Sequence, residues 1–154
     1  MKIFFATLLT IVILLGGGYW LGDKLAAEGR AESVRSSLED MQLGPCPSAP
    51  SCVNSDSEPT DFHFILPIND PDGTRWAKLV ATLEGMEGAE LVLSTDNYVY
   101  FTFTTKYFGF VDDAEFYHRP REELIAVRSA SRIIKADLGN NRRRIENVRV
   151  ALGL

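Results

Sequence analysis

The sequence predicts an α+β protein in which a single N-terminal transmembrane helix precedes a two-layer domain. Three observations support this prediction: an uncharged apolar run at residues 3–21, short alternating apolar segments between residues 90 and 132, and a segment of helical apolar spacing on either side of them. Short turns between consecutive strands imply antiparallel neighbours. We therefore expect a mainly antiparallel sheet of about four to five strands, covered by two helices.

Length and charge limit the class of protein. The chain has 154 residues, of which 45% are hydrophobic, and this is sufficient for one domain with an appendage. A formal net charge of -5 argues against a nucleic-acid partner, because such proteins usually carry a basic footprint. The arginines at positions 142–144 form the only tight basic cluster, so an anionic partner would be met at one spot.

Residues 1–22 are expected to form a transmembrane anchor or an uncleaved signal. At about 1.5 Å rise per residue, the uncharged run spans roughly 28 Å, close to the hydrocarbon thickness of a bilayer. Ala26 and Ala27 make only a poor cleavage site, which favours an uncleaved anchor. Tyr19 and Trp20 lie near the far end, where amphipathic aromatic residues meet headgroups. Gly18, four residues before Gly22, completes a pattern that lets another helix approach closely but also occurs by chance.

Two signals disagree about the side of the membrane on which the domain lies. The basic residues that follow the span are Lys24, Arg30 and Arg35. Only Lys2 and the amino terminus precede it, so charge counting is ambiguous or reversed. Cys46 and Cys52 bracket a short proline-containing loop, and an isolated pair this close suits a disulfide in an oxidising compartment. We therefore expect the domain on the extracytoplasmic, periplasmic side.

Residues 23–59 are expected to be a helical stalk followed by a Pro/Ser-rich linker that carries the disulfide, and residues 60–154 the globular α+β domain. The histidines, His63 and His118, are solitary and fit no zinc spacing. No metal and no cofactor are expected.

The domain should begin with a strand from Thr60, in which Phe62, Phe64 and Leu66 alternate. A turn follows, and Thr74 is expected to cap the first helix of the domain.

Further strands are predicted at residues 90–95, 98–107, 111–117 and 124–132, and a last helix at 140–152. In the second of these strands Val99, Phe101 and Phe103 should pack on the helices. The intervening residues, Tyr100, Thr102 and Thr104, should lie on a semi-exposed face.

The acidic strand and the basic strand that follows it should form a hairpin. Placing Phe116 opposite Ile125 brings Asp113 opposite Arg128. The same register puts Ala114 opposite Val127 and Asp112 opposite Ser129. Asp112 then lies on the covered face and needs a buried donor, since a charge out of water is tolerated only with a partner. The candidate donors are Ser129, Ser131 or an arginine of the last helix.

A catalytic interpretation of these carboxylates is the alternative. Asp112 and Asp113 are adjacent and point to opposite faces of a regular strand, which excludes an aspartic dyad. Asp113 and Glu115 share a face at roughly 6 to 7 Å, which touches the separation found in inverting glycosidases. Alternating acids are also frequent on solvated strands, so we name no catalytic residue.

The arginines at the start of the last helix are unfavourably placed relative to the helix dipole, and they need a negative partner. Glu146 can meet Arg142 or Arg143 on the helix surface. The other internal candidates are Asp112, Asp113, Glu115 and Asp137. The external candidates are a lipid headgroup or an acidic patch on a partner protein.

Four motifs in order, CPSAPSCVNSD, YFGFVDDAEFY, VRSASR and DLGNNRRRIENVR, make the chain from about Cys46 onward resemble the domain-of-unknown-function family fourteen-ninety-nine. The resemblance implies a small membrane-associated or exported domain of uncharacterised activity. It supplies no catalytic residues.

We expect a membrane-anchored accessory protein that docks on, or helps to assemble, a larger membrane protein complex. A small-molecule or lipid-anion binder is the alternative, and a hydrolase using Asp113 and Glu115 comes third. The residues expected to form a structural charge cluster, or else an anion or partner site, are Asp112, Asp113, Glu115, Arg128, Ser129, Ser131, Arg132, Arg142 and Arg143.

Overall fold

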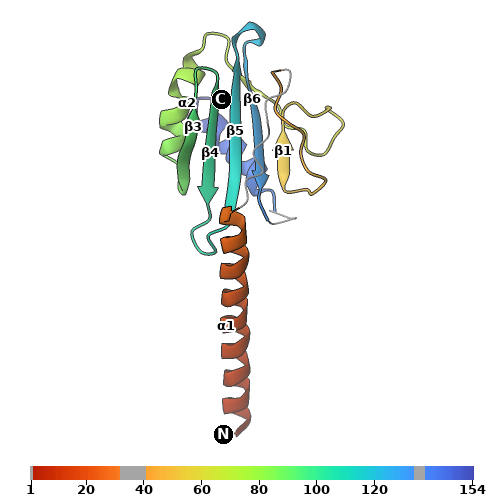
Figure 1. The fold of residues 1–154 in the computed structure, drawn as a ribbon, viewed down its shortest axis with the longest axis vertical. Coiled ribbons are helices and arrows are strands. Elements are labelled where there is room, and N and C mark those ends of the chain that lie inside the picture. Colours follow the sequence, from red (N-terminus) through yellow and green to blue (C-terminus); the bar gives the residue numbers. More distant parts are fainter. Residues whose placement is uncertain (1, 32–40, 134–137) are drawn as a thin grey trace.

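The computed structural model describes residues 2–31, 41–133 and 138–154. A long helix, α1 (Lys2–Ala31), projects from one end of the domain (Figure 1). Its segment Phe4–Lys24 has a mean hydropathy of 1.9, and the domain covers none of its most apolar window. By length and composition this helix could cross a membrane once. A signal sequence can have the same length and composition. The predicted stalk beyond Ala31 lies outside the described residues.

The domain is built on an antiparallel sheet with the strand order β1-β6-β5-β4-β3, in which β2 also pairs with β6. Consecutive short turns produce a meander from β3 to β6, as the alternating sequence predicts. The strands are β1 (Cys52–Asn54), β2 (Ile68–Asn69), β3 (Ala89–Ser94), β4 (Tyr98–Thr104), β5 (Val111–Arg119) and β6 (Leu124–Ser131). The α+β prediction is confirmed. β1 lies in the range that the sequence assigns to the linker.

Two helices, α2 (Thr74–Glu84) and α3 (Asn140–Ala151), cover one face of the sheet (Figure 1). Their apolar stripes bury Leu79 and Leu83 from α2, and Ile145 and Val148 from α3. The strand residues that meet them include Val99, Phe101, Phe103, Ala114, Phe116, Ile125 and Val127. This face contains the main hydrophobic core.

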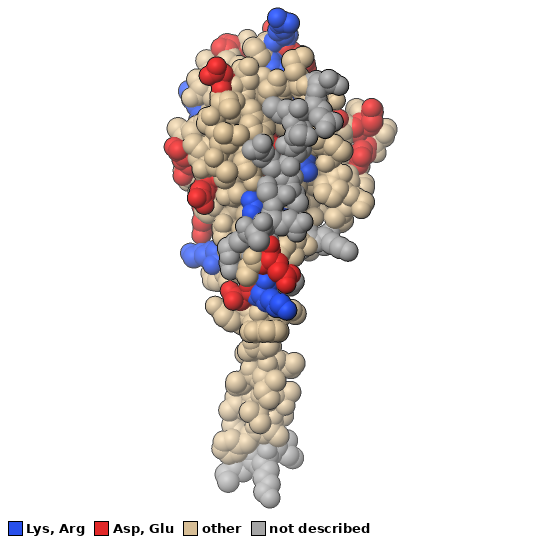
Figure 2. All heavy atoms as spheres, in the orientation of Figure 1, with Lys and Arg blue, Asp and Glu red and all other residues tan. Residues whose placement is uncertain are grey.

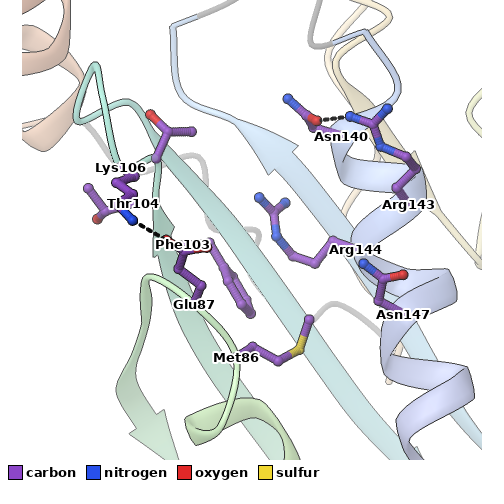
Figure 3. A pocket seen from close by; sticks show the side chains of 10 residues that line it. Met86, Glu87, Phe103, Thr104, Lys106, Asn140, Arg143, Arg144 and Asn147 are labelled. Atoms are coloured by element: carbon purple, nitrogen blue, oxygen red, sulfur yellow. Dashed lines mark hydrogen bonds and ion pairs between the residues drawn. The ribbon is translucent and has the colours of Figure 1, made fainter.

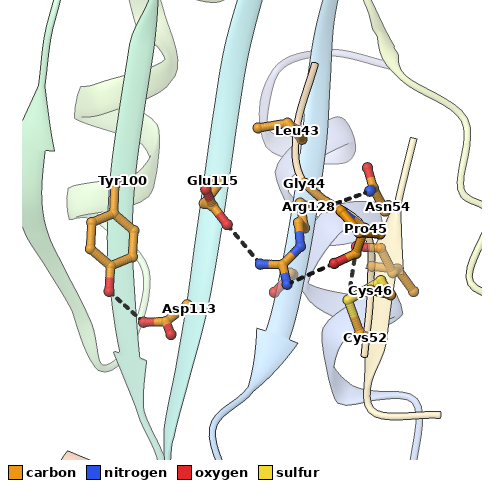
Figure 4. Close-up of polar contacts among 12 residues, drawn as sticks. Leu43, Gly44, Pro45, Cys46, Cys52, Asn54, Tyr100, Asp113, Glu115 and Arg128 are labelled. Atoms are coloured by element: carbon orange, nitrogen blue, oxygen red, sulfur yellow. Dashed lines mark hydrogen bonds and ion pairs between the residues drawn. A yellow bond between two sulfur atoms is a disulfide. The ribbon is translucent and has the colours of Figure 1, made fainter. Parts of the chain in front are cut away.

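The opposite face of the sheet is also covered, which corrects the prediction that it is semi-exposed. Tyr98 and Tyr100 are buried there and form a smaller apolar cluster with Leu43 and Ala126. Thr102 is buried as well. A chain segment that includes Leu43 lies over this side of the strands (Figure 4). We call this side the tyrosine face.

The strand predicted from Thr60, with Phe62, Phe64 and Leu66 in alternation, is wrong. The segment forms turns and a single parallel bridge between Phe64 and Asn54. Phe62 and Leu66 are exposed, whereas the residues between them, His63 and Ile65, are buried. An offset of one residue reverses the faces of an extended segment. Ile65 joins the main core.

Aspartates, rather than Thr74, satisfy the first backbone N–H groups of α2. Asp70 accepts hydrogen bonds from the backbone N–H groups of Arg75 and Trp76, at 3.0 and 3.1 Å. Asp72 accepts from the hydroxyl and the backbone N–H of Thr74, at 2.7 and 3.1 Å. These two hydrogen bonds lower the pKa of Asp72. The prediction that Thr74 caps the helix is therefore wrong, because Asp70 and Asp72, which precede α2, accept the hydrogen bonds of its first backbone N–H groups.

The disulfide between Cys46 and Cys52 is present, with Cα atoms 5.8 Å apart. Cys52 belongs to β1, which pairs with β6 through Cys52 and Ala130. The bond therefore fastens the segment before β1 to the edge of the sheet.

Gly88 is expected to be indispensable to the connection between α2 and β3. Its φ is 75°, and a Cβ at this position would lie 2.3 Å from the carbonyl oxygen of Thr104. Gly88→Ala should lower the free energy of unfolding by about 3 kcal/mol or more, since it adds a backbone clash to the strain of positive φ. Gly73 has a similar φ of 73° but open space around it. Gly73→Ala is the matched control and should cost only about 1 kcal/mol. Equal losses in chemical denaturation would contradict the clash.

Candidate functional site

The β5–β6 hairpin brings together most of the charged residues singled out above, in a register two residues away from the predicted one. Phe116 pairs with Val127 rather than Ile125, Glu115 pairs with Arg128, and Asp113 pairs with Ala130. β5 extends further than predicted, to Arg119, which pairs with Leu124 of β6 around the short 3-10 helix η1 (Pro120–Glu122), whereas β6 ends at Ser131, one residue before its predicted end. A shift of two residues keeps every side chain on its predicted face but changes its partner.

Asp112, Ala114 and Phe116 lie on the helix-covered face, whereas Asp113 and Glu115 lie on the tyrosine face. The predicted charge cluster is therefore two clusters, separated by the sheet. The adjacent carboxylates of Asp112 and Asp113 do point to opposite faces, as expected of a regular strand.

Glu115 and Arg128 form the central ion pair of the tyrosine face (Figure 4). A guanidinium nitrogen of Arg128 lies 2.7 Å from Oε1 of Glu115, and the hydroxyl of Tyr98 donates to Oε2 at 2.7 Å. The side chain of Glu115 is fully buried and that of Arg128 is 3% exposed. Arg128 also donates to the carbonyl oxygen of Pro45 at 3.4 Å. Burial of this degree requires a paired carboxylate.

Asp113 is equally buried and pairs with Arg132 instead of the predicted Arg128. Arg132 donates to Asp113 Oδ1 through Nη2 at 2.7 Å, and the hydroxyl of Tyr100 donates to the same oxygen at 2.5 Å. Burial by itself lowers the pKa of Arg132, but the hydrogen bonds and charge of Asp113, with smaller contributions from Tyr100, raise it above the ordinary value. Arg132 is therefore held in its charged form.

Asp112 receives its buried donor from the last helix, one of the predicted candidates. Nη2 of Arg144 lies 2.5 Å from Asp112 Oδ2, and the guanidinium lies over the ring of Phe103 at 4.5 Å. The other guanidinium nitrogen donates to Ser129 Oγ at 3.0 Å and to Asn141 Oδ1 at 2.6 Å. Asn141 in turn donates to Ser131 Oγ at 3.0 Å.

In the part of the chain that the structure describes, Arg142 and Arg143 bond to oxygens other than those of the predicted carboxylates. Arg142 donates to the carbonyl oxygens of Phe62 and Phe64, at 3.1 and 2.8 Å. Arg143 donates to the side chain of Asn140 in the first turn of α3. Glu146 pairs with Arg149, at 3.4 Å, rather than with Arg142 or Arg143. Asp137, the remaining internal candidate, lies outside the described residues.

Several members of these clusters escaped the sequence analysis. Asp56 and Arg119 form a nearly buried two-pronged pair, at 2.9 and 2.5 Å, across 63 residues of sequence. No local pattern signals a contact of that range. Tyr98 and Tyr100 carried a usable signal, because they alternate on β4 with the buried Val99 and Phe101 and so share the face of β5 that carries Asp113 and Glu115.

A pocket of about 410 Å³ opens where the end of β4 faces the first turns of α3 (Figure 3). Its wall combines the apolar Met86 and Phe103 with three cations, Lys106, Arg143 and Arg144. Lys106 lies 3.7 Å from Glu87, which also lines the pocket.

The arrangement favours structural roles for the paired carboxylates over catalysis. Asp113 and Glu115 share a face, as predicted, but both are fully buried and each accepts from an arginine and a tyrosine. A general acid or base has to exchange its proton with a substrate, which these contacts oppose. Among the described residues there is also no group of three or more His, Cys, Asp or Glu side chains that could hold a metal ion.

Comparison with known families gives one match, over residues 42–152, to the family described as protein of unknown function (DUF1499). No curated protein and no solved structure matches the chain.

The Glu115–Arg128 pair is expected to be a requirement of the fold. Arg128→Met should lower the free energy of unfolding by roughly 3 to 5 kcal/mol, since it leaves a buried carboxylate without its cation. Glu115→Gln in the same chain should recover part of this loss, because the unpaired charge is gone. Denaturant titration of the two single variants and the double variant measures the coupling.

The control for this cycle is Arg121→Met, at an exposed arginine of η1, which should change stability by less than about 0.5 kcal/mol. Additive losses from Arg128→Met and Glu115→Gln would show that the two side chains do not depend on each other.

Proposed function

The chain belongs to the family of proteins of unknown function DUF1499, and from this premise we propose that it is a membrane-anchored accessory protein. In this proposal its domain faces the extracytoplasmic side and docks on, or helps to assemble, a larger membrane protein complex.

The observation that carries the proposal is the exposed apolar surface of α1. Figure 2 draws the body of this helix as a column without charged side chains that leaves the domain at a junction where acidic and basic residues gather. Four consecutive residues, Val12, Ile13, Leu14 and Leu15, are all exposed, and at about 3.6 residues per turn they lie on all sides of the helix. An apolar surface that runs all round a helix needs lipid or protein to cover it. The length of Phe4–Lys24 matches the hydrocarbon thickness of a bilayer.

The disulfide supports the proposed placement of the domain on the extracytoplasmic side of the membrane. Cys46 and Cys52 are the chain's two cysteines and both are used in the bond. Disulfides persist in oxidising compartments such as the periplasm and are rare in the cytosol.

The internal pairing of the buried charged residues supports docking through apolar side chains instead. The buried carboxylates of β5 are each engaged by arginines of the same chain, and the exposed apolar side chains are what remains to meet a partner. A hollow of about 370 Å³ lies at the hairpin end of the sheet, lined in part by Leu66, Pro67, Leu124 and Leu154. Leu66 and Leu154 are exposed. This hollow suits an apolar side chain of a partner protein.

The experiment is gentle solubilisation of native membranes that contain the full chain with a carboxyl-terminal tag on a flexible linker. Native mass spectrometry then gives the mass of the assembly and of the protein itself. We expect a stoichiometric complex that contains the chain with an intact amino terminus. Leu66→Glu should release the partner, whereas Val92→Glu, an exposed change on β3, should retain it.

A lone protein shortened at its amino terminus would overturn the proposal. A complex that survives Leu66→Glu would leave the accessory role in place but exclude the hollow as the docking point.

Binding of a small anion is the second candidate, and the pocket at the start of α3 favours it. Of the arginines first considered, Arg128, Arg132 and Arg142 are engaged inside the fold, which leaves Arg143, on the pocket wall with Lys106. Arg144 on the same wall is paired with Asp112, so Arg143 and Lys106 face the carboxylate of Glu87, and the net positive charge favours an anion such as a phosphate.

Phosphate should then raise the melting temperature of the purified full chain, by an amount that grows with the logarithm of its concentration above the dissociation constant and is smaller at high salt. Arg143→Gln should abolish this shift, and Arg121→Gln, at an exposed arginine outside the pocket, should not. An unchanged melting temperature across inorganic phosphate and glycerophosphate would reject this candidate.

A further inference from the structure

The loop between β4 and β5 presents two aromatic side chains to the outside. Tyr107 is 82% exposed and Phe108 is 54% exposed. The loop that carries them is nonetheless well defined by hydrogen bonds. Thr105 N–H donates to Phe110 O at 2.8 Å, and Gly109 N–H donates back to Thr105 O at 2.9 Å. The ring of Phe108 stacks on that of Phe110, with centroids 5.6 Å apart. Two exposed aromatic rings on a turn that is closed by hydrogen bonds form an apolar surface that lipid or another protein can cover.

This loop lies beside the last turns of α1 (Figure 1). Phe108 lies against Gly22, which is buried, and a Cβ at Gly22 would be 3.3 Å from Cδ1 of the ring. Tyr107 and Phe108 enclose a small hollow together with Tyr19 and Asp23 of α1. Glycine at position 22 therefore permits a close approach by the chain's own loop.

The other glycine of the pair behaves differently. Nothing lies within 4 Å of a Cβ built at Gly18. The contact with Phe108 therefore explains the glycine at position 22 without a second membrane helix, whereas no residue that the structure describes makes such a contact at Gly18.

The contact fixes the height of the loop relative to the apolar helix. The segment that could cross a membrane ends at Lys24, and Tyr19 and Trp20, which are exposed, lie about one turn before that end. Tyrosine and tryptophan are enriched at the level of the headgroups. Tyr107 lines the same hollow as Tyr19, so it lies at that level too.

We propose that the β4–β5 loop is a second membrane contact, in which Tyr107 and Phe108 enter the interfacial layer of the bilayer beside α1. The inference rests on the proposed membrane anchor and deepens it. α1 alone leaves the domain free to swing about the helix end, whereas a helix and a loop at the same height hold the base of the sheet against the bilayer. The β5–β6 hairpin then points away from the membrane, by roughly 30 Å for a strand of this length.

The test uses the full chain in phosphatidylcholine nanodiscs with an environment-sensitive nitrobenzoxadiazole label on one introduced cysteine. The native cysteines are in the disulfide and do not react without reductant. Three separate variants carry the label: Tyr107→Cys in the loop, Val12→Cys in the middle of α1, and Arg121→Cys at the hairpin end. We expect label 12 to be buried in lipid, label 107 to be quenched by headgroup-attached nitroxide, and label 121 to be quenched by aqueous iodide alone.

The outcomes separate the two proposals. A lipid-buried label at position 12 with a fully aqueous label at 107 would overturn the loop contact and leave the anchor in place. An aqueous label at position 12 would overturn the anchor itself, and the loop contact with it.

A matched pair of glycine variants tests the placement of the loop. Gly22→Leu should displace Phe108 and expose label 107 to iodide, because the added side chain occupies the site of the ring. Gly18→Leu adds the same side chain to open space on the same helix and should leave the label unchanged. Equal behaviour of the two variants would contradict the seating of the loop on α1.

Discussion

The pairing of buried carboxylates on β5 with arginines is the constraint on which the rest of the structure depends. β5 is the central strand of the sheet, and it carries Asp112, Asp113 and Glu115 in succession. Each of these charges is removed from water, and each is tolerated because a guanidinium reaches it. The arginines come from β6, from the residue that follows it, and from α3, so the pairs connect the sheet to the elements on both of its sides.

The same kind of interaction fastens the start of the domain. Arg128 of β6 donates to the carbonyl of Pro45, and the backbone N–H of Leu43 donates to Asp56 at 2.8 Å, the carboxylate that also holds Arg119. The Cys46–Cys52 disulfide fixes this segment to β1. The first described residues after α1 are thus held to the sheet by ion pairs, hydrogen bonds and a covalent bond.

In the proposed function, the surfaces that meet a partner or the bilayer lie at the two ends of the sheet rather than in its interior. At the end nearest α1 lie the β4–β5 loop and the cationic pocket at the start of α3, and at the other end lie the hairpin and the apolar hollow that Leu66 and Leu154 help to line. The buried charged residues hold the strands and helices together. A buried carboxylate that already accepts hydrogen bonds from an arginine and a tyrosine has little freedom to react. The accessory role proposed above needs only such surfaces, held at fixed positions relative to one another.

The sequence by itself determined the apolar N-terminal helix, the α+β class, the disulfide, the strands from β3 to β6 and the face of every acid on β5, because these follow from local periodicity and spacing. It also indicated that Asp112 needs a donor such as an arginine of the last helix. Only the tertiary structure decided the partners. Two apolar residues of similar size, Ile125 and Val127, could each face Phe116, and in the folded hairpin Val127 does so. Three further features depend on segments that are distant in sequence, and no local pattern encodes the approach of such segments. They are the exchange of buried and exposed faces at residues 62–66, the Asp56–Arg119 pair and the contact of Phe108 with Gly22.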